Sequence, residues 1–393
     1  MKYFFILGTN PTLSLSELAA VFSHGKFAMI QKNIAILDIG EEINPKIIKK
    51  IGGTVKLGLI RAAVDSPSEK DILKSLASFA MPEKNEKKFQ FGISHYGKTR
   101  INAKILGMEF KKTLKQSGVN SRWVISKEPC LSSVVVEQNK LIGANGIEIA
   151  IIEFNKKIFL GKTLAVQPFK ELSFRDYGRP ARDDKSGMLP PKLAQIMINL
   201  SGANPDRAAL DPFCGSGTIL TEAMLMGFKN IIGSDISGKA LRDTKDNIAW
   251  IQSKFQISNF NFQLFNSGAA RISEHTAPNS IDAIITEPYL GPQRGQFEIS
   301  KTAKNLEQLY SESLAEFKKI LRPTGKIAMI WPIFSENRKN IFLNPDFSGF
   351  KIINPVPDDL RKNTFIKLTD RGTIVYGREN QKIWREIVVL KKG

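Results

Sequence analysis

The sequence predicts an α/β fold for its C-terminal half, preceded by two smaller units that mix helices and strands. Three observations support this prediction. From about residue 192 onward, helical and strand patterns alternate, which favours a parallel sheet with crossover helices. A short strand then runs into a Gly-rich turn and a helix within "AALDPFCGSGTILTEAMLMG", residues 208–227. The next strand ends in an acid, Asp235, within "NIIGSDISGKALRD".

Residues 1–60 are predicted to form a small α+β unit. The opening "MKYFFILGTNP" has the charge and apolar run of a signal peptide, but the run is short and no small-residue cleavage site follows it. We therefore expect a strand that turns into the helix "SLSELAAVF", capped at Ser14 or Ser16.

Residues 61–170 are predicted to form the second unit, with a helix at 69–80 and a strand at 88–97. A basic amphipathic stretch follows, and its apolar residues at helical spacing are Ile101, Ile105, Met108 and Leu114. The stretches "RWVISKEPCLSSVVVEQNKL" and "GIEIAIIEFNKKIFLGKTLAVQPF" are typical of strands joined by turns. Residues 171–191, rich in Gly, Pro and charge, form the candidate linker to a domain at 192–393.

The composition limits the possible partners. The chain has 393 residues, a formal charge of +19 and a sequence pI of about 9.7, which favours a polyanionic partner. Nucleic acid is favoured over membrane, because no apolar run is long enough to span a bilayer. The 2 cysteines, Cys130 and Cys214, and 3 histidines give neither a disulfide framework nor a metal-ligand spacing. We expect no metal and a reducing, cytoplasmic setting.

The Gly-rich turn at 214–217 is the most informative feature of the sequence. Glycines let the backbone approach a ligand closely, and the first turn of the following helix offers free N–H groups. A phosphate-binding P-loop would need a Lys after the turn, and a dinucleotide fingerprint would need a Gly where Leu220 stands. S-adenosylmethionine, which carries no phosphate, fits better. Asp211 at the strand tip is positioned to hold its ammonium group.

Asp235 supports this cofactor, because an acid at the end of the adjacent strand typically accepts hydrogen bonds from ribose hydroxyls. For each acid a helix cap is the alternative role, and Asp235 does precede a helix. A third contact, to the adenine, is expected at Asn266 or Ser267, where the strand "FNFQLFN" ends. The predicted cofactor-binding residues are Asp211, Phe213, Gly215, Gly217, Asp235, Ile236, Asn266 and Ser267.

Nearly the whole chain resembles the archaeal and eukaryotic tRNA guanosine-10 N2-methyltransferases. "DPFCGSGTILTEA" is similar to their cofactor loop, and "RDYGRPARDDKSGMLPPKLAQIMINL" to the link before it. "FGISHYG", "RWVISKEPCLSSVVV" and "LGKTLAVQPF" resemble their THUMP domain, "YFFILGTNPTLSLSEL" their N-terminal ferredoxin-like domain, and "GTIVYGRENQKIWREI" their closing strands. The resemblance implies a ferredoxin-like domain at 1–60, a THUMP domain at 61–170 and a Rossmann-like class I methyltransferase domain at 192–393.

The resemblance also implies an active segment in "IITEPYLGP", just past the fourth strand. Related enzymes place Asp, Asn or Ser, then Pro-Pro, then an aromatic residue there. The implied catalytic residues here are Thr286, Glu287, Pro288 and Tyr289. A side chain and a backbone carbonyl would accept hydrogen bonds from the target amine, while Tyr289 stacks on the base. Thr286 and Glu287 depart from the family pattern, so either one can be the acceptor, and a plain strand-turn is the alternative.

Basic residues between 84 and 127 are expected to form an RNA phosphate-binding face, and the set includes Lys98, Arg100, Lys104 and Arg122. The predicted function is S-adenosylmethionine-dependent methylation of a guanine N2 amine in tRNA, at position 10. Two alternatives stay open: methylation of another amine, such as rRNA guanine N2 or adenine N6, and a catalytically silent RNA-binding protein. A nicotinamide oxidoreductase is disfavoured by Leu220 and by the lack of a hydride partner.

Overall fold

The computed structural model describes residues 1–65, 68–82, 88–97, 101–182, 188–292, 295, 297–336, 339–377 and 381–393. Their contacts divide them into two compact units, which are treated separately below. Unit 1 comprises residues 1–9, 24–49 and 54–169, and unit 2 comprises residues 10–23, 50–53 and 170–393. None of the helices that the structure describes combines the length and apolarity needed to span a bilayer.

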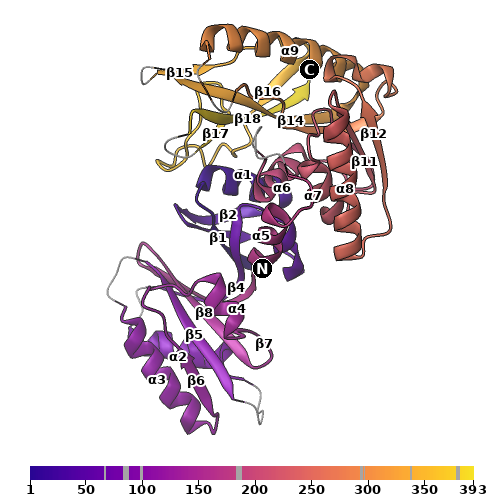
Figure 1. Cartoon of the computed structure of the whole chain (residues 1–393). Helices are drawn as coiled ribbons and strands as arrows, with labels where there is room; N and C mark the ends of the chain where they lie inside the picture. Colours follow the sequence, from indigo (N-terminus) through magenta and orange to yellow (C-terminus); the bar gives the residue numbers. More distant parts are fainter. Residues whose placement is uncertain are drawn as a thin grey trace. The chain divides into compact units, whose positions relative to one another are not determined.

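Unit 1 is built on one mixed sheet with the strand order β2-β3-β1-β4-β9-β8-β5-β6, to which β7 adds beside β8 (Figure 1). The predicted boundary at residue 60 therefore lies inside β4, which pairs with β1 on one side and β9 on the other. The strands are β1 (Lys2–Leu7), β2 (Lys26–Gln31), β3 (Ile34–Asp38), β4 (Thr54–Asp65), β5 (Phe89–Tyr96), β6 (Ser121–Val124), β7 (Ile142–Gly143), β8 (Gly146–Phe154) and β9 (Lys157–Val166).

Helices α2 (Glu69–Phe79) and α3 (Ala103–Gln116) cover one face of this sheet. Side chains alternate along β8, so Ile149 and Ile151 face these helices while Ala150 and Ile152 face the other way. The predicted helix and the strand at 88–97 are confirmed. The apolar stripe predicted for α3 is wrong in part: Leu106, Phe110 and Leu114 are buried, whereas Ile105 and Met108 are 40% and 50% exposed.

The segment 121–140 holds one strand and one helix instead of the predicted run of strands. After β6, the chain forms the short helix α4 (Ser133–Gln138). Ser132 caps α4, because its side chain accepts a hydrogen bond from the Val135 N–H at 3.2 Å. The cap overrides the strand preference of the valine run 134–136. The loop after residue 40 contains a 3-10 turn, Pro45–Lys50.

The N-terminal helix α1 (Pro11–Val21) belongs to unit 2 by its contacts. It starts earlier than predicted, because Asn10 caps it in place of Ser14 or Ser16. The Asn10 side chain accepts from the Leu13 N–H at 3.1 Å and donates to the Val375 carbonyl at 3.1 Å. Pro11 then occupies the first helical position, where its missing N–H costs nothing.

Glu17 holds α1 within unit 2. Its buried carboxylate accepts from the backbone N–H groups of Gly52 and Gly53 at 2.8 and 2.7 Å, and from Asn199 Nδ2 at 2.7 Å. Asn199 lies on α6 (Pro191–Ser201), so one side chain joins α1, the 50–53 turn and the first helix of the C-terminal domain. Burial raises the pKa of Glu17 to about 7.

The sheet of unit 2 has the strand order β12-β11-β10-β13-β14-β18-β16, with β15 beside β14 and β17 beside β18. The strands from β12 to β14 run parallel, and β18 is antiparallel to both of its neighbours β14 and β16. The bounds are β10 (Ala208–Asp211), β11 (Asn230–Asp235), β12 (Asn261–Asn266), β13 (Ile281–Thr286), β14 (Leu321–Glu336), β15 (Lys339–Phe342), β16 (Phe350–Ile353), β17 (Ile374–Tyr376) and β18 (Ile383–Lys392).

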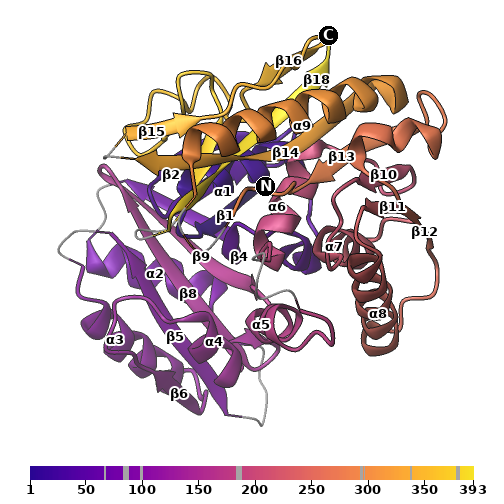
Figure 2. The ribbon, with the colours of Figure 1, turned by 45° about the horizontal axis from the view of Figure 1, so that its top comes forward.

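The helices of unit 2 cover both faces of its sheet, as the predicted alternation requires. α6, α7 (Thr218–Met226) and α8 (Gly238–Phe255) lie on one face, and α9 (Ile299–Ile320) with the 3-10 turn Ala269–Glu274 lies on the other (Figure 2). The predicted linker begins with a helix, α5 (Phe169–Tyr177). The strand order reverses between β10 and β13, and such a switch point is where open α/β sheets bind ligands.

The cap at Asn10 generates the first prediction. Replacing Asn10 with Ala removes the acceptor for the Leu13 N–H and the donor to Val375, so the free energy of unfolding should fall by about 0.5–2 kcal/mol. Ser16→Ala is the matched control, because the Ser16 hydroxyl donates only to the Thr12 carbonyl inside the helix. Denaturant unfolding of both variants measures this difference. Equal losses in the two variants would show that Asn10 is not the cap.

Candidate active site

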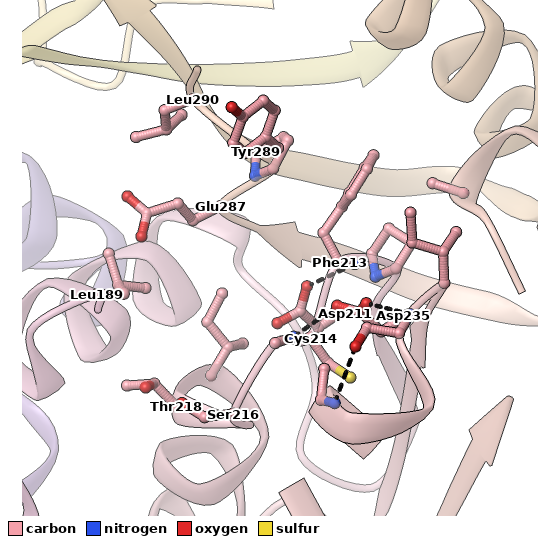
Figure 3. Close-up of a pocket in the computed structure, with 18 of the residues that line it drawn as sticks. Leu189, Asp211, Phe213, Cys214, Ser216, Thr218, Asp235, Glu287, Tyr289 and Leu290 are labelled. Carbon is pink, nitrogen blue, oxygen red and sulfur yellow. Dashed lines mark hydrogen bonds between the residues drawn. The ribbon is translucent and has the colours of Figure 1, made fainter. Parts of the chain in front are cut away.

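A pocket of about 580 Å³ opens at the switch point of the unit 2 sheet. Its walls come from the residues that follow the C-terminal ends of β10, β11, β12 and β13, together with α9 and β18. It therefore joins segments that lie far apart in the sequence, as expected for parallel strands that end at one edge. Figure 3 shows Asp211, Phe213, Cys214 and Asp235 together, with Glu287, Tyr289 and Leu290 on the other side of the pocket.

The Gly-rich turn forms the floor of this pocket and leads directly into α7 at Thr218, as predicted. Gly215 and Gly217 have φ angles of +53° and +81°, which side chains other than glycine rarely tolerate. A Cβ on Gly217 would also come within 2.9 Å of Thr244 on α8. Gly217 occupies the N-cap position of α7 and has no side chain that could cap the helix, so the first N–H groups of α7 suit a ligand.

Asp211 ends β10 and is 2% exposed. Its Oδ1 accepts from the Thr286 hydroxyl at 2.7 Å and from the Phe213 N–H at 3.2 Å. Burial raises the pKa of Asp211 to about 7, and the nearby carboxylates of Asp235 and Glu287 contribute to the same direction. The pocket thus holds a carboxyl group whose negative charge is poorly stabilised by the protein itself.

Asp235 ends β11, as predicted, and lines the same pocket. Its carboxylate accepts from the N–H groups of Gly215 and Ser237 at 3.0 and 2.9 Å, so it fixes the Gly-rich turn to the start of α8. The cap of α8 is Ser237, whose side chain accepts from the Ala240 N–H. The neighbouring Ile236 also lines the pocket and is 79% exposed. An exposed apolar side chain there provides a surface for a flat ligand group.

Asn266 and Ser267 lie outside the pocket lining. The Asn266 amide instead donates to the backbone carbonyls of Asp235 and Ile236 at 2.9 and 3.0 Å, which shapes the loop after β11. The wall beyond β12 is made by Gly268, Ala269 and Ala270. In the sequence, Asn266 and Ser267 therefore come just before the residues that line the pocket.

The segment "TEPY" spans the edge of the pocket. Thr286 is the last residue of β13 and is fully buried, with its hydroxyl directed to Asp211. Glu287, Pro288 and Tyr289 line the pocket, and Tyr289 is 54% exposed. The Tyr289 carbonyl accepts from the Tyr310 hydroxyl at 2.7 Å, which anchors the turn to α9. Of the two candidate acceptors, Glu287 faces the pocket and Thr286 does not.

Arg385 is a pocket residue that the sequence analysis missed. It lies on β18, and its Nε donates to Glu287 Oε1 at 2.5 Å. No local sequence signal marks it, because 98 residues separate the partners.

The link before α6 also contributes residues that the sequence analysis did not single out. Arg175 pairs with the buried Glu222 of α7 at 2.6 Å, and Gln195 donates to the same carboxylate at 2.9 Å. Arg179 donates to the Thr218 hydroxyl at 2.6 Å. The link thus fixes the N-terminal turn of α7, which borders the pocket.

Unit 1 has a second hollow of about 560 Å³, bounded by β5, the start of α3 and residues 123–129. Lys104, Lys127 and Trp123 line it. Arg122 is exposed but lies outside its lining, and Lys98 and Arg100 lie outside the described residues. Within the part of the chain that the structure describes, no group of three or more His, Cys, Asp or Glu side chains is placed to hold a metal ion.

Two family models match the chain. One, described as an RMKL-like methyltransferase domain, matches residues 179–341, and one described as a DNA methylase matches residues 83–246. TrmN from Thermus thermophilus has a similar fold, with a TM-score of 0.54 and 18% identity over 100% of both chains. These matches, the strand order and the Gly-rich turn define a Rossmann-like methyltransferase domain, which confirms the predicted fold of the C-terminal half.

Three curated relatives are tRNA (guanine(10)-N2)-dimethyltransferases, one of them named as probable. The Methanothermobacter thermautotrophicus protein is 34% identical over 37% of this chain and 39% of its own length. The Pyrococcus abyssi protein is 25% identical over 84% of this chain and 88% of its own length. The probable enzyme of Methanothermococcus thermolithotrophicus is 32% identical over 30% of this chain and 69% of its own length. The chain belongs to the tRNA (guanine(10)-N2)-methyltransferase family, as predicted.

The buried Asp211 generates the second prediction. Its pKa in the folded protein, about 7, lies above its ordinary value of 3.8, so the folded state loses stability as pH rises from about 4 to 7. Asp211→Asn keeps an oxygen that can accept from Thr286 and Phe213 but carries no charge. At pH 8 the variant should be more stable than the wild type by roughly 1–4 kcal/mol, and the difference should shrink toward pH 4.

Unfolding experiments at several pH values measure this difference. Asp206→Asn is the control, because the Asp206 side chain is 66% exposed, and it should leave stability nearly unchanged at each pH. A difference between Asp211→Asn and the wild type that does not depend on pH would contradict the role assigned to the charge.

Proposed function

We propose that this protein transfers a methyl group from S-adenosylmethionine to the exocyclic N2 amine of a guanosine in tRNA, at position 10. One observation carries the proposal: a single pocket joins the Gly-rich turn and its two acids to the segment Glu287-Pro288-Tyr289. The names of the curated relatives support the same chemistry and substrate. The proposal includes a cytoplasmic setting, which suits a tRNA substrate and the free thiols of Cys130 and Cys214.

The pocket fits the proposed cofactor in charge and in shape. When bound, S-adenosylmethionine supplies a methyl group attached to a positively charged sulfur. Asp211 would balance the ammonium group of the cofactor, and Asp235 would accept from its ribose hydroxyls. Ile236 and the wall at Gly268–Ala270 would contact the adenine. Burial raises the pKa of Asp211, and the carboxylates of Asp235 and Glu287 add to this effect, so a cationic ligand would favour the charged form of Asp211.

The other side of the pocket fits a flat base. An exocyclic amine is a weak nucleophile, because its lone pair is delocalised into the ring. Glu287 would accept from the N–H bonds of the amine, which localises electron density on nitrogen and orients it. Tyr289 would stack on the base after it leaves its pair in the tRNA. Thr286 acts indirectly, by holding Asp211 in place.

Unit 1 would position the RNA. We propose that residues 1–60 correspond to a ferredoxin-like domain and residues 61–170 to a THUMP domain, with β4 shared at their boundary. The exposed Lys104 and Arg122, together with Lys127 in the second hollow, suit contacts with phosphates, while Trp123 offers an aromatic surface. Such contacts would orient the tRNA without reading its sequence.

The direct test is incubation of the full chain with unmodified tRNA and methyl-labelled S-adenosylmethionine, followed by nucleoside analysis. We expect label in N2-methylguanosine or N2,N2-dimethylguanosine, and mapping of the labelled nucleotide tests position 10. Label in N6-methyladenosine, or no transfer to tRNA, would contradict the proposal.

The third prediction concerns Tyr289. Stacking on an aromatic ring contributes about 1–3 kcal/mol per base, so Tyr289→Ala should lower the methylation rate roughly 5- to 150-fold. Tyr289→Phe should keep most of the activity, because stacking needs the ring and not the hydroxyl. Tyr177→Ala is the control, since Tyr177 is 67% exposed and lies outside the pocket lining. Full activity of Tyr289→Ala in a single-turnover assay would remove this residue from the site.

The fourth prediction concerns RNA binding. Reversing the charges of Lys104 and Arg122 should weaken tRNA binding and flatten its salt dependence, by roughly 0.9 in the log–log slope for each phosphate that is no longer neutralised. Reversing Lys32 and Lys156, two exposed lysines in hairpin turns of the same unit, is the matched control. Titrations at several salt concentrations measure both slopes. If the two double variants have equal slopes, the phosphate-binding face lies on other residues.

A further inference from the structure

Glu287 forms an ion pair with Arg385 on the target side of the pocket, and the proposed function gives Arg385 no role. The side chains of Glu287 and Arg385 are 12% and 14% exposed, and both line the pocket. Removing two charges from water is costly, and such a pair rarely stabilises a fold more than apolar residues of the same size would. Its presence beside the active segment therefore points to a function in the pocket.

Each partner keeps polar atoms that are not used by the protein. Arg385 donates through Nε to Glu287 Oε1. Among the residues that the structure describes, neither Glu287 Oε2 nor the Nη groups of Arg385 have a hydrogen-bond partner. The pair thus presents an acceptor and a set of donors next to each other. Arg385 lies on β18 opposite Pro332 of β14 and Tyr376 of β17, so its backbone is held by strands on both sides.

This pattern is complementary to one base. Guanine has the O6 acceptor beside two donors, N1–H and N2–H, along a single edge. Adenine and cytosine have the reverse order, with an amine donor next to a ring-nitrogen acceptor. The acceptor on Glu287 and the donors on Arg385 would form hydrogen bonds with guanine. With adenine or cytosine, the same groups would be left unpaired, and a site built from hydrogen bonds rejects analogues in this way.

We propose that Arg385 is a specificity-determining residue that selects guanine by donating to O6, while Glu287 accepts from N1–H and N2–H. This inference rests on the proposed methylation of guanine N2 and identifies the residue that chooses the base. The alternative is that Arg385 only holds Glu287 in place. The two roles differ in one respect: a positioning role affects equally every base that has both N1–H and the N2 amine, whereas contact with O6 matters only for guanine.

The test compares two bases at the methylated nucleotide of the tRNA, once that nucleotide has been mapped. One is guanine, and the other is 6-thioguanine, which keeps N1–H and the N2 amine but replaces O6 with sulfur, a much weaker hydrogen-bond acceptor. Both bases pair with cytosine, so the pairing nucleotide stays the same. We expect the wild-type kcat/KM to favour guanine by about 10-fold or more, and Arg385→Met to abolish most of this preference by slowing guanine alone.

Arg385→Met keeps an unbranched side chain without charge, and binding of S-adenosylmethionine by calorimetry shows whether it folds. Arg385→Lys, which keeps the charge without the planar fork, should recover part of the preference if a donor to O6 is what matters. Lys391→Ala removes one charge from an exposed position of the same strand and should keep the wild-type ratio.

If Arg385→Met slows both bases equally and keeps the ratio, Arg385 only positions Glu287 and the proposal is wrong. A wild type with no preference between the two bases would also overturn it. If the wild type methylates no guanine in tRNA, the proposed function itself fails, and this outcome is visible before any variant is made.

Discussion

The hydrogen bond from Thr286 to Asp211 is the contact on which the pocket depends. It joins the C-terminal ends of β10 and β13, which are neighbours in the sheet although 75 residues separate the two side chains. Because the strand order reverses at this point, a crevice is expected at the edge where the two strands end. The Gly-rich turn after Asp211 and the segment after Thr286 therefore open into the same space, and neither could form the pocket alone.

The charge of the pocket is opposite to that of the chain. The protein carries a formal charge of +19, yet Asp211, Asp235 and Glu287 gather at one site. Of these, Glu287 is paired with an arginine, Asp235 is held by backbone N–H groups, and Asp211 is left with a raised pKa. In the proposed function, the positive charge of the chain would attract RNA, while the acids of the pocket would suit a cationic methyl donor. The two proposed ligands would thus meet charges of opposite sign.

Local patterns in the sequence predicted the features that depend on neighbouring residues. The Gly-rich turn, the acids at the ends of β10 and β11 and the pocket segment after β13 all follow from strand and turn signals within a few residues. Features that depend on tertiary packing were missed or wrong. Arg385 reaches the pocket only because β18 pairs with β14, and Ile105 turned outward because α3 packs through Leu106 and Phe110. Asn10 was missed as a cap, although a proline at the next position is typical of a helix start.

The unusual order of Thr286 and Glu287 has a physical explanation in this arrangement. In the family pattern that the segment resembles, the polar residue that ends the strand is the acceptor for the target amine. Here that position is a buried Thr that holds Asp211, and the carboxylate has moved one residue along the chain. Successive side chains of an extended segment point to opposite sides, so this shift places the acid on the pocket side. A carboxylate just past the end of a strand has no fixed orientation of its own. Arg385 on β18 orients the Glu287 carboxylate by donating a hydrogen bond to it. The altered segment and the distant arginine would therefore be two parts of the proposed acceptor site.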